Sequence, residues 1–235
     1  MAIKYARTEY IKRSKGQNAC YRSAYNANIK IKDQRTNQTF DFRKNKTNVF
    51  HEILLPAYVN NKFKNAESFS NLVEKSEKRK NSQLFKEFII ALPNDVGITL
   101  NDHIALCYKF IEVREYVKEN LGVQIDIHYP KESDNLYAKI LITTRRFNKN
   151  GESLADKARD LDPIVKTGKS RFVAGGKELA GETWGKVQTA YFEENALNIT
   201  VKEISDTPEA HIGLRKYGEL AEFNREIKAR RQHGN

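Results

Sequence analysis

Two hydrophobic periodicities alternate along the chain, and each predicts a type of element. Apolar runs with a period near two, or dense apolar runs stopped by proline or glycine, predict β-strands. We expect strands at residues 2–11, 49–55, 84–92, 123–129, 136–146 and 197–201. Apolar residues spaced three and four apart predict helices, and these fall at residues 18–28, 67–80, 101–120 and 177–196. The pattern therefore predicts a chain that contains both strands and helices.

The segments 123–129 and 136–146 show the strictest alternation and predict an antiparallel hairpin. Val123, Ile125 and Ile127 fall on one face of the first strand, and Gln124, Asp126 and His128 fall on the other. The second strand places Ala138, Ile140 and Ile142 on one face and Tyr137, Lys139, Leu141, Thr143 and Arg145 on the other. One face of the hairpin is therefore predicted to join the core, and the other carries polar groups suited to a functional site.

The helix expected at 18–28 places two phenols on one face, because Tyr21 and Tyr25 are four residues apart. Beyond Phe147 the chain becomes rich in Gly and Lys up to about Gly176, which indicates loops and a weaker core signal.

Composition adds a partner class to this picture. The net charge of +11, from 41 Lys and Arg against 30 Asp and Glu, favours an anionic partner such as DNA or RNA. No apolar run approaches the ~20 residues that span a bilayer, and the first residues lack the apolar stretch of a signal peptide. With only two cysteines, the sequence predicts a cytoplasmic protein without membrane insertion.

Several segments, in this order, resemble the MobA/MobL family of mobilisation relaxases, including the amino-terminal domains of TraA-type conjugation proteins. The segments are MAIKYARTEYIKRSKGQNA at the start, NACYRSAYNA at 18–27, IKDQRTNQTFDF at 31–42, HEILLP at 51–56, EKRKNSQLFKEFIIALP at 77–93, KILITTRRF at 139–147 and, more weakly, PEAHIGLRKYG at 208–218. The resemblance implies an HUH-type relaxase domain over residues 1–218, with a core at 1–147, a more variable part at 148–218, and a basic tail or linker start at 219–235. It also implies an α+β fold with a mainly antiparallel central sheet flanked by helices.

The resemblance also implies a function and a site. Members of the family cut one strand of plasmid DNA at a transfer origin with a tyrosine, through a 5′-phosphotyrosyl intermediate, and this tyrosine falls on Tyr25. A phenol with a pKa near 10 is a poor nucleophile at neutral pH, so it needs a base or a cation beside it. The implied partners are single-stranded or hairpin origin DNA, together with relaxosome and type IV secretion proteins.

The family's divalent metal, Mg²⁺ or Mn²⁺, is held by three histidines on the hairpin, and this sequence departs from that pattern. His128 matches the first ligand, but Tyr137 and Lys139 occupy the other two positions. A protonated lysine cannot coordinate a metal. Of an acidic pair that some members carry on the central strand, Glu87 remains and Ile89 stands at the second position.

Three interpretations stay open. The chain is a decayed relaxase that only binds DNA; or Lys139, expected beside Tyr137 and opposite His128, replaces the metal's charge; or Asp126, His128, Asp134 and Glu87 form a carboxylate-rich metal site. Non-catalytic DNA binding and RNA binding are the alternative function classes.

The remaining candidates are basic residues and histidines. Basic residues that we expect beside the site, and therefore near phosphates, are Arg22, Lys30, Lys86, Arg145 and Arg146. The other histidines, His51 among them, show no metal-ligand spacing and are interpreted as structural or solvated.

Overall fold

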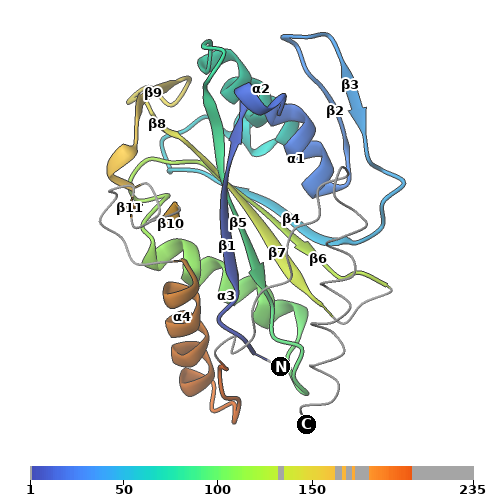
Figure 1. The fold of residues 1–235 in the computed structure, drawn as a ribbon, viewed down its shortest axis with the longest axis vertical. Helices are drawn as coiled ribbons and strands as arrows, with labels where there is room; N and C mark the ends of the chain where they lie inside the picture. Colours follow the sequence, from blue (N-terminus) through green and yellow to red (C-terminus); the bar gives the residue numbers. More distant parts are fainter. Residues whose placement is uncertain (1, 132–134, 162–165, 168–170, 173–179, 203–235) are drawn as a thin grey trace. The chain divides into compact units, whose positions relative to one another are not determined.

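The computed structural model describes residues 2–131, 135–161, 166–167, 171–172 and 180–202, which belong to one compact unit. Its centre is a five-stranded antiparallel sheet with the strand order β1-β5-β7-β6-β4 (Figure 1). These strands are β1 (Ala6–Lys12), β4 (Asn48–Leu54), β5 (Gln83–Ala91), β6 (Val123–His128) and β7 (Tyr137–Thr143). The predicted α+β fold with a mainly antiparallel sheet is confirmed.

Helices cover both faces of this sheet (Figure 1). The apolar face of the β6–β7 hairpin, with Ile125 and Ile140, shares a core with α3 (Leu100–Val113) and α4 (Ala180–Glu194). On the opposite face, Leu141 of β7 shares a second core with α1 (Ala19–Ala27) and α2 (Ala66–Ser76). Strict alternation along the hairpin sends successive side chains into these two layers. The predicted division of the hairpin into two faces is confirmed.

The α1 and α2 layer covers only part of its face with apolar contacts. Ile11, Phe85 and Leu141 pack against the two helices at the end of the sheet where β1 ends and β5 begins. Farther along the same face the strands carry polar side chains, and α1 faces them. The fold therefore leaves a polar region between α1 and the sheet.

The helix α1 begins and ends through side-chain chemistry in its sequence. The Asn18 side chain accepts a hydrogen bond from the Tyr21 amide at the start of the helix, and Asn28 adopts the left-handed conformation at its end. These two caps fix the nine-residue helix, and with it the position of Tyr25.

Shorter elements surround the sheet. The strand β2 (Lys30–Lys32) pairs with β3 (Thr39–Asp41), β8 (Arg145–Phe147) with β9 (Leu154–Lys157), and β10 (Lys166–Thr167) with β11 (Arg171–Phe172). Three 3-10 turns complete the described elements: η1 (Arg13–Lys15), η2 (Asn61–Lys64) and η3 (Arg159–Leu161).

Two predicted elements are wrong in part. The helix expected at 101–120 ends at Val113, because Glu115 adopts a left-handed φ of 56° that a helix cannot continue. The strand expected at 197–201 does not form; next to it, only an isolated bridge joins Ile3 to Lys202. The whole of the expected tail at 219–235, and the end of the expected 1–218 domain, lie outside the described residues. No helix among those described is long and apolar enough to cross a membrane.

Candidate active site

The strands bring polar side chains into neighbouring rows on the α1 face of the sheet. The antiparallel pairing places His51 of β4 beside Asp126 of β6, and Asp126 beside Lys139 of β7. In the next row toward the strand ends, His128 lies beside Tyr137. Tyr137, and not Lys139, is therefore the residue directly opposite His128, which corrects the pairing expected from the sequence.

Glu87 lies on the same face and is held by α1. Its side chain is fully buried; Arg22 forms an ion pair with it, and Asn26 Nδ2 donates a hydrogen bond of 2.8 Å to Oε1. Arg22 also pairs with Glu9, which stands opposite Glu87 on β1. Burial raises the pKa of Glu87, while Arg22 and Asn26 act against this shift. Arg22 therefore serves first as the counter-ion of two carboxylates.

Tyr25 projects from α1 over Lys139. The Lys139 Nζ atom lies 4.3 Å from the centroid of the Tyr25 ring, and the Tyr25 residue is 36% exposed. The ring is stacked on Tyr21, with centroids 6.2 Å apart, and meets Phe42 edge to face. The phenol is thus accessible to a large substrate and has an ammonium group close to it.

Lys139 is a buried cation. Its residue is 8% exposed, its Nζ lies 5.5 Å from the centroid of the Tyr137 ring, and burial lowers its pKa. The nearby carboxylates of Glu87 and Asp126 oppose this lowering. Among the described residues, its ammonium group contacts two aromatic faces and makes no ion pair or hydrogen bond. It therefore retains the donors with which it can bind an incoming anion.

The two ring nitrogens of His128 differ in their surroundings. Its Nδ1 lies 3.1 Å from the Thr47 hydroxyl, whose own proton is donated to Asn28 Oδ1, so Nδ1 carries the imidazole proton. Its Nε2 is buried and has no hydrogen-bond partner within the part of the chain that the structure describes. Desolvation, with the charge of Lys139, lowers the pKa of His128 to about 3. The imidazole is therefore neutral, and its Nε2 carries a lone pair that can accept a hydrogen bond.

Asp126 has its oxygens occupied by neighbours. His51 Nδ1 lies 2.7 Å from Oδ1, and Gln124 Nε2 donates to Oδ2 at 2.7 Å. Burial raises the pKa of Asp126, and His51 is the first of the groups that oppose this shift. His51 is thus a site residue that sequence reasoning missed; its alternate position in the 49–55 strand was the available signal.

These donors do not fit the family's three-histidine metal centre. Of the three family positions, only that of His128 carries an imidazole, while Tyr137 and Lys139 fill the other two. Among the described residues, no group of three or more His, Cys, Asp or Glu could hold a metal ion. In the carboxylate-rich alternative, Glu87 accepts a hydrogen bond from Asn26, and Asp126 lies within hydrogen-bond distance of His51 and accepts from Gln124. Asp134 lies outside the described residues, so this alternative stays a prediction.

Three of the basic residues expected beside Tyr25 lie elsewhere. Lys86 is fully buried on the opposite face from Glu87 and donates to the Ala158 carbonyl at 3.1 Å. Arg145 pairs with Glu77, and Arg146 pairs with Glu119 and Asp160. Their expected position was wrong, because strand alternation and strand length carry them away from the site.

The other two differ in their surroundings. Arg22 lies at the site, as described above. Lys30 is exposed on β2, opposite Asp41 of β3.

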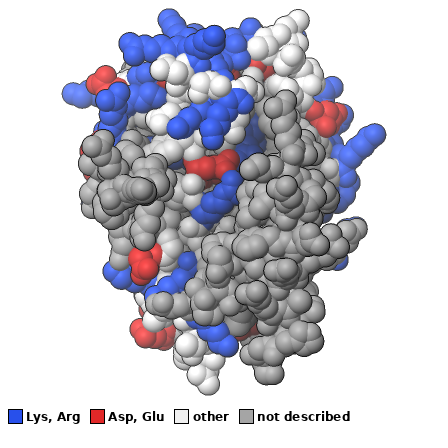
Figure 2. All heavy atoms as spheres, viewed as in Figure 1, with Lys and Arg blue, Asp and Glu red and all other residues white. Residues whose placement is uncertain are grey.

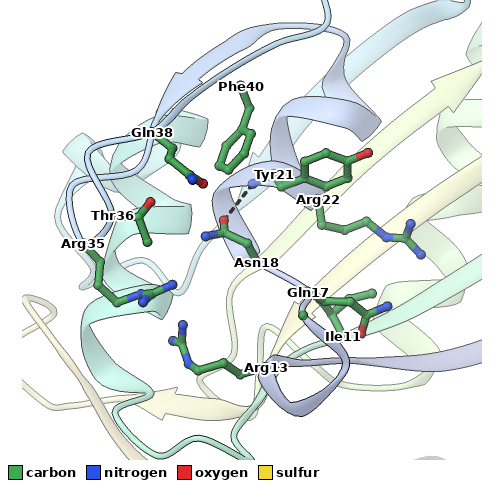
Figure 3. Close-up of a pocket in the computed structure, with 11 residues that line it drawn as sticks. Ile11, Arg13, Gln17, Asn18, Tyr21, Arg22, Arg35, Thr36, Gln38 and Phe40 are labelled. Atoms are coloured by element: carbon green, nitrogen blue, oxygen red, sulfur yellow. Dashed lines mark hydrogen bonds between the residues drawn. The ribbon is translucent and has the colours of Figure 1, made fainter.

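A cavity of about 410 Å³ opens between the start of α1 and the β2–β3 ribbon (Figure 3). Tyr21 and Arg22 border it on the α1 side, and Phe40 borders it on the ribbon side. Arg13 and Arg35 point toward each other and share the Glu74 carboxylate. Tyr21, Tyr25, Phe40 and Phe42 contact one another as an aromatic cluster that runs from this cavity to the candidate nucleophile.

Comparison with known proteins identifies relatives of this chain. The model of the MobA/MobL family matches residues 17–216. The conjugal transfer protein TraA of Agrobacterium fabrum is 28% identical over 161 residues, which are 64% of this chain and 14% of that protein. The mobilization protein MobL of Acidithiobacillus ferridurans is 28% identical over 189 residues, 70% of this chain and 48% of that protein. The chain thus spans less than half the length of each.

A solved structure gives the same relationship in three dimensions. It is described as "Molecular Basis of Vancomycin Resistance Transfer in Staphylococcus aureus" and superposes with a TM-score of 0.69 at 30% identity. The match covers 88% of this chain and all of the other.

Proposed function

The chain belongs to the MobA/MobL family, and we propose that it is a relaxase domain, a DNA endonuclease that cuts one strand at the transfer origin of a plasmid or other mobile element. Its relatives are named for conjugal transfer and mobilization, which supports this role. Relaxosome and type IV secretion proteins are the protein partners that the proposal implies, and a cytoplasmic location follows from it.

Tyr25 is the proposed nucleophile. Its phenolate oxygen forms a bond to the scissile phosphorus, and the bond to the 3′ oxygen of the preceding nucleotide breaks. That oxygen leaves as a 3′ hydroxyl after taking a proton, while the phenol proton passes to water. The 5′ end stays joined to Tyr25 as a phosphodiester, so attack by a 3′ hydroxyl rejoins the strand.

Lys139 supplies the charge that this reaction needs. The observation that carries this proposal is the buried Nζ, 4.3 Å from the Tyr25 ring centroid and without an ion pair or hydrogen bond among the described residues. An ammonium there stabilises a phenolate and binds the phosphate oxygens as negative charge develops on them. His128 lies on the same face of the sheet as Lys139, and its Nε2 can accept a hydrogen bond there. No step of this mechanism passes through a metal, because the donor set does not fit one.

The aromatic cluster supports single-stranded DNA as the substrate. Unpaired bases stack on aromatic side chains whatever their identity, and duplex bases do not. Tyr21 and Phe42 contact the nucleophile, and Phe40 extends this aromatic surface through its contact with Tyr21. RNA would bind the same faces, and a direct competition between the two nucleic acids separates these possibilities.

A second candidate function rests on the replaced ligands. With Tyr137 and Lys139 at two metal positions, the domain would bind origin DNA without cutting it. The two candidates differ in one outcome, the covalent adduct.

The test is strand cutting on single-stranded oligonucleotides that tile both strands beside the gene, with and without EDTA. We expect cutting by the native protein in EDTA, loss of cutting by Tyr25→Phe, and retention by the matched control Tyr21→Phe. Specific binding to one tiled segment without cutting would reject the catalytic proposal in favour of the DNA-binding module.

A further inference from the structure

A second cavity, of about 500 Å³, lies at the end of the sheet where β5 ends and β7 begins. None of the described residues that line it is charged, and we name it the uncharged cavity. Besides Leu92 and two asparagines, its lining consists of Ile3, Tyr5, Ile89, Ala91, Leu136 and Tyr137. The chain has a net charge of +11, and its Lys and Arg side chains gather at the top of the face in Figure 2. An uncharged lining of this size therefore sets the cavity apart from the rest of the surface.

The strand register places this cavity next to the proposed catalytic lysine. Ile89 of β5 lies directly beside Lys139 of β7. One row farther toward the end of the sheet, Ala91 lies beside Tyr137, and the Ala91 amide donates to the Tyr5 carbonyl at 3.1 Å. Side chains two residues apart along a strand share a face. The cavity therefore lies on the same face of the sheet as Lys139 and follows it by one row.

Tyr137 belongs to both the cavity and the site. Its ring centroid lies 5.5 Å from Lys139 Nζ, and its ring is stacked on His128 with centroids 5.0 Å apart. Tyr5 adds a second aromatic side chain to the lining, and aliphatic side chains form most of the rest. Such walls fit a flat, uncharged ring and offer no counter-ion for a phosphate.

The two cavities on this face lie at opposite ends of β1. Ile11 and Arg13 line the cavity beside the aromatic cluster, whereas Tyr5 lines the uncharged cavity. A single DNA strand that stacks on the aromatic cluster and continues past Lys139 therefore reaches the uncharged cavity.

We propose that the uncharged cavity holds the base of the nucleotide next to the phosphate that Tyr25 attacks. This inference rests on the proposed function. Tyr137 and Lys139 are two residues apart on β7, which is about 7 Å, and a nucleotide spans a distance of this order from its phosphate to its base. With the phosphate at Lys139, the base enters the cavity and stacks on Tyr137 or Tyr5. The bound base then fixes the phosphate against the nucleophile.

The test compares intact DNA strands with DNA strands that lack one base. All proteins carry Tyr25→Phe, so that binding is measured without cutting. The probe is the tiled single-stranded oligonucleotide that binds most tightly, together with copies that each contain one abasic nucleotide. We expect the abasic nucleotide next to the scissile phosphate to weaken binding, measured by fluorescence anisotropy, by about 5- to 150-fold, which is the effect of losing one stacked base.

A variant that fills the cavity assigns this effect to it. Ala91→Phe adds a ring from the surface of the sheet, and Ala155→Phe is the matched control, since both alanines are partly exposed strand residues and Ala155 lies outside the cavity. Ala91→Phe should weaken binding of the intact DNA strand by the same factor, and the abasic nucleotide should then have no further effect. Ala155→Phe should keep the native affinity and the full abasic effect.

A second variant guards against misfolding of the first. Tyr5→Leu removes one aromatic wall without adding volume, and it should weaken binding of the intact DNA strand by about 5-fold or more. The urea midpoint of each variant shows whether it is folded.

An Ala91→Phe protein that keeps the full abasic effect would overturn the inference, as would an abasic nucleotide beside the scissile phosphate that leaves binding unchanged. Cutting is measured separately on proteins that retain Tyr25. Binding with the expected abasic pattern but without cutting would support the cavity and reject catalysis. Cutting without this pattern would reject the cavity alone, and a protein that binds none of the tiled DNA strands would overturn both proposals.

Discussion

Replacing Arg22 by methionine should destabilise the protein, and the loss should depend on pH through Glu87. The variant keeps most of the side-chain volume but leaves a fully buried carboxylate, to which Asn26 still donates a hydrogen bond. Breaking a buried ion pair typically costs about 3–5 kcal/mol. Since Arg22 itself is 21% exposed, the low end of this range applies.

The carboxyl group limits the loss by taking up a proton. The ordinary pKa of this carboxyl group is 4.5, so pH 7 lies 2.5 pH units above it. Protonating Glu87 in the folded variant at pH 7 therefore costs about 3.4 kcal/mol, and the loss of folding free energy cannot exceed this value. At pH 5 the same bound is about 0.7 kcal/mol. The folded-state pKa of Glu87 is raised, so stability falls as pH rises from the unfolded value toward the folded one.

The assay is urea unfolding at pH 5 and pH 7, followed by fluorescence of Trp184, the single tryptophan, which is fully buried. We expect a loss of about 3 kcal/mol at pH 7 and under ~1 kcal/mol at pH 5. Adding Glu87→Gln should restore most of the loss at pH 7. The control Arg7→Met, whose partner Glu9 is partly exposed, should cost about 1 kcal/mol or less. Equal losses at both pH values, or no restoration by Glu87→Gln, would refute the assigned role of Arg22.

Three further outcomes follow from the same structure. Lys139→Met should reduce the single-turnover rate of strand cutting by about 10²–10³-fold, and an unchanged rate in the variant would contradict the role of Lys139. In the native protein, the rate should fall with rising pH at pH values below those at which an ordinary lysine loses its proton, because burial lowers the pKa of Lys139. Asn18→Ala should lower the free energy of unfolding by about 1 kcal/mol, as the α1 cap is lost, and a native urea midpoint would count against this. Gly151→Ala should lower the free energy of unfolding by about 2 kcal/mol or more, since φ of Gly151 is 68° and the new Cβ would lie 2.4 Å from the Tyr58 carbonyl oxygen. A smaller decrease in the free energy of unfolding, measured in urea, would show that the turn relaxes.

Periodicity predicted the parts of this fold where the pattern repeats. The alternation of the hairpin at 123–146 separated core from site because each strand is buried on both faces by different layers. The four-residue spacing of Tyr21 and Tyr25 predicted their common face, and the rings are stacked. The β2–β3 ribbon was missed, since three-residue strands carry too few residues to show a period.

The site could be predicted only as far as local pattern reaches. His51 and Asp126 are 75 residues apart, and their contact depends on the β4–β6 register, which no local pattern contains. Lys86 was expected near phosphates because of its charge, yet strand alternation buries it on the far face of the sheet. Arg145 was expected beside Tyr25 and instead pairs with Glu77. Net charge predicts the class of partner, whereas the burial of each basic residue decides whether it can contact that partner.

The central claim is that Tyr25 attacks DNA with the help of Lys139 and without a metal. The most direct test is to incubate the protein in EDTA with the bound single-stranded oligonucleotide and locate any covalent DNA adduct by mass spectrometry of its peptides. The account predicts an adduct on the Tyr25 peptide that forms in EDTA and is greatly reduced in Lys139→Met. An adduct on another residue, or one that forms only with added Mg²⁺ or Mn²⁺, would contradict it.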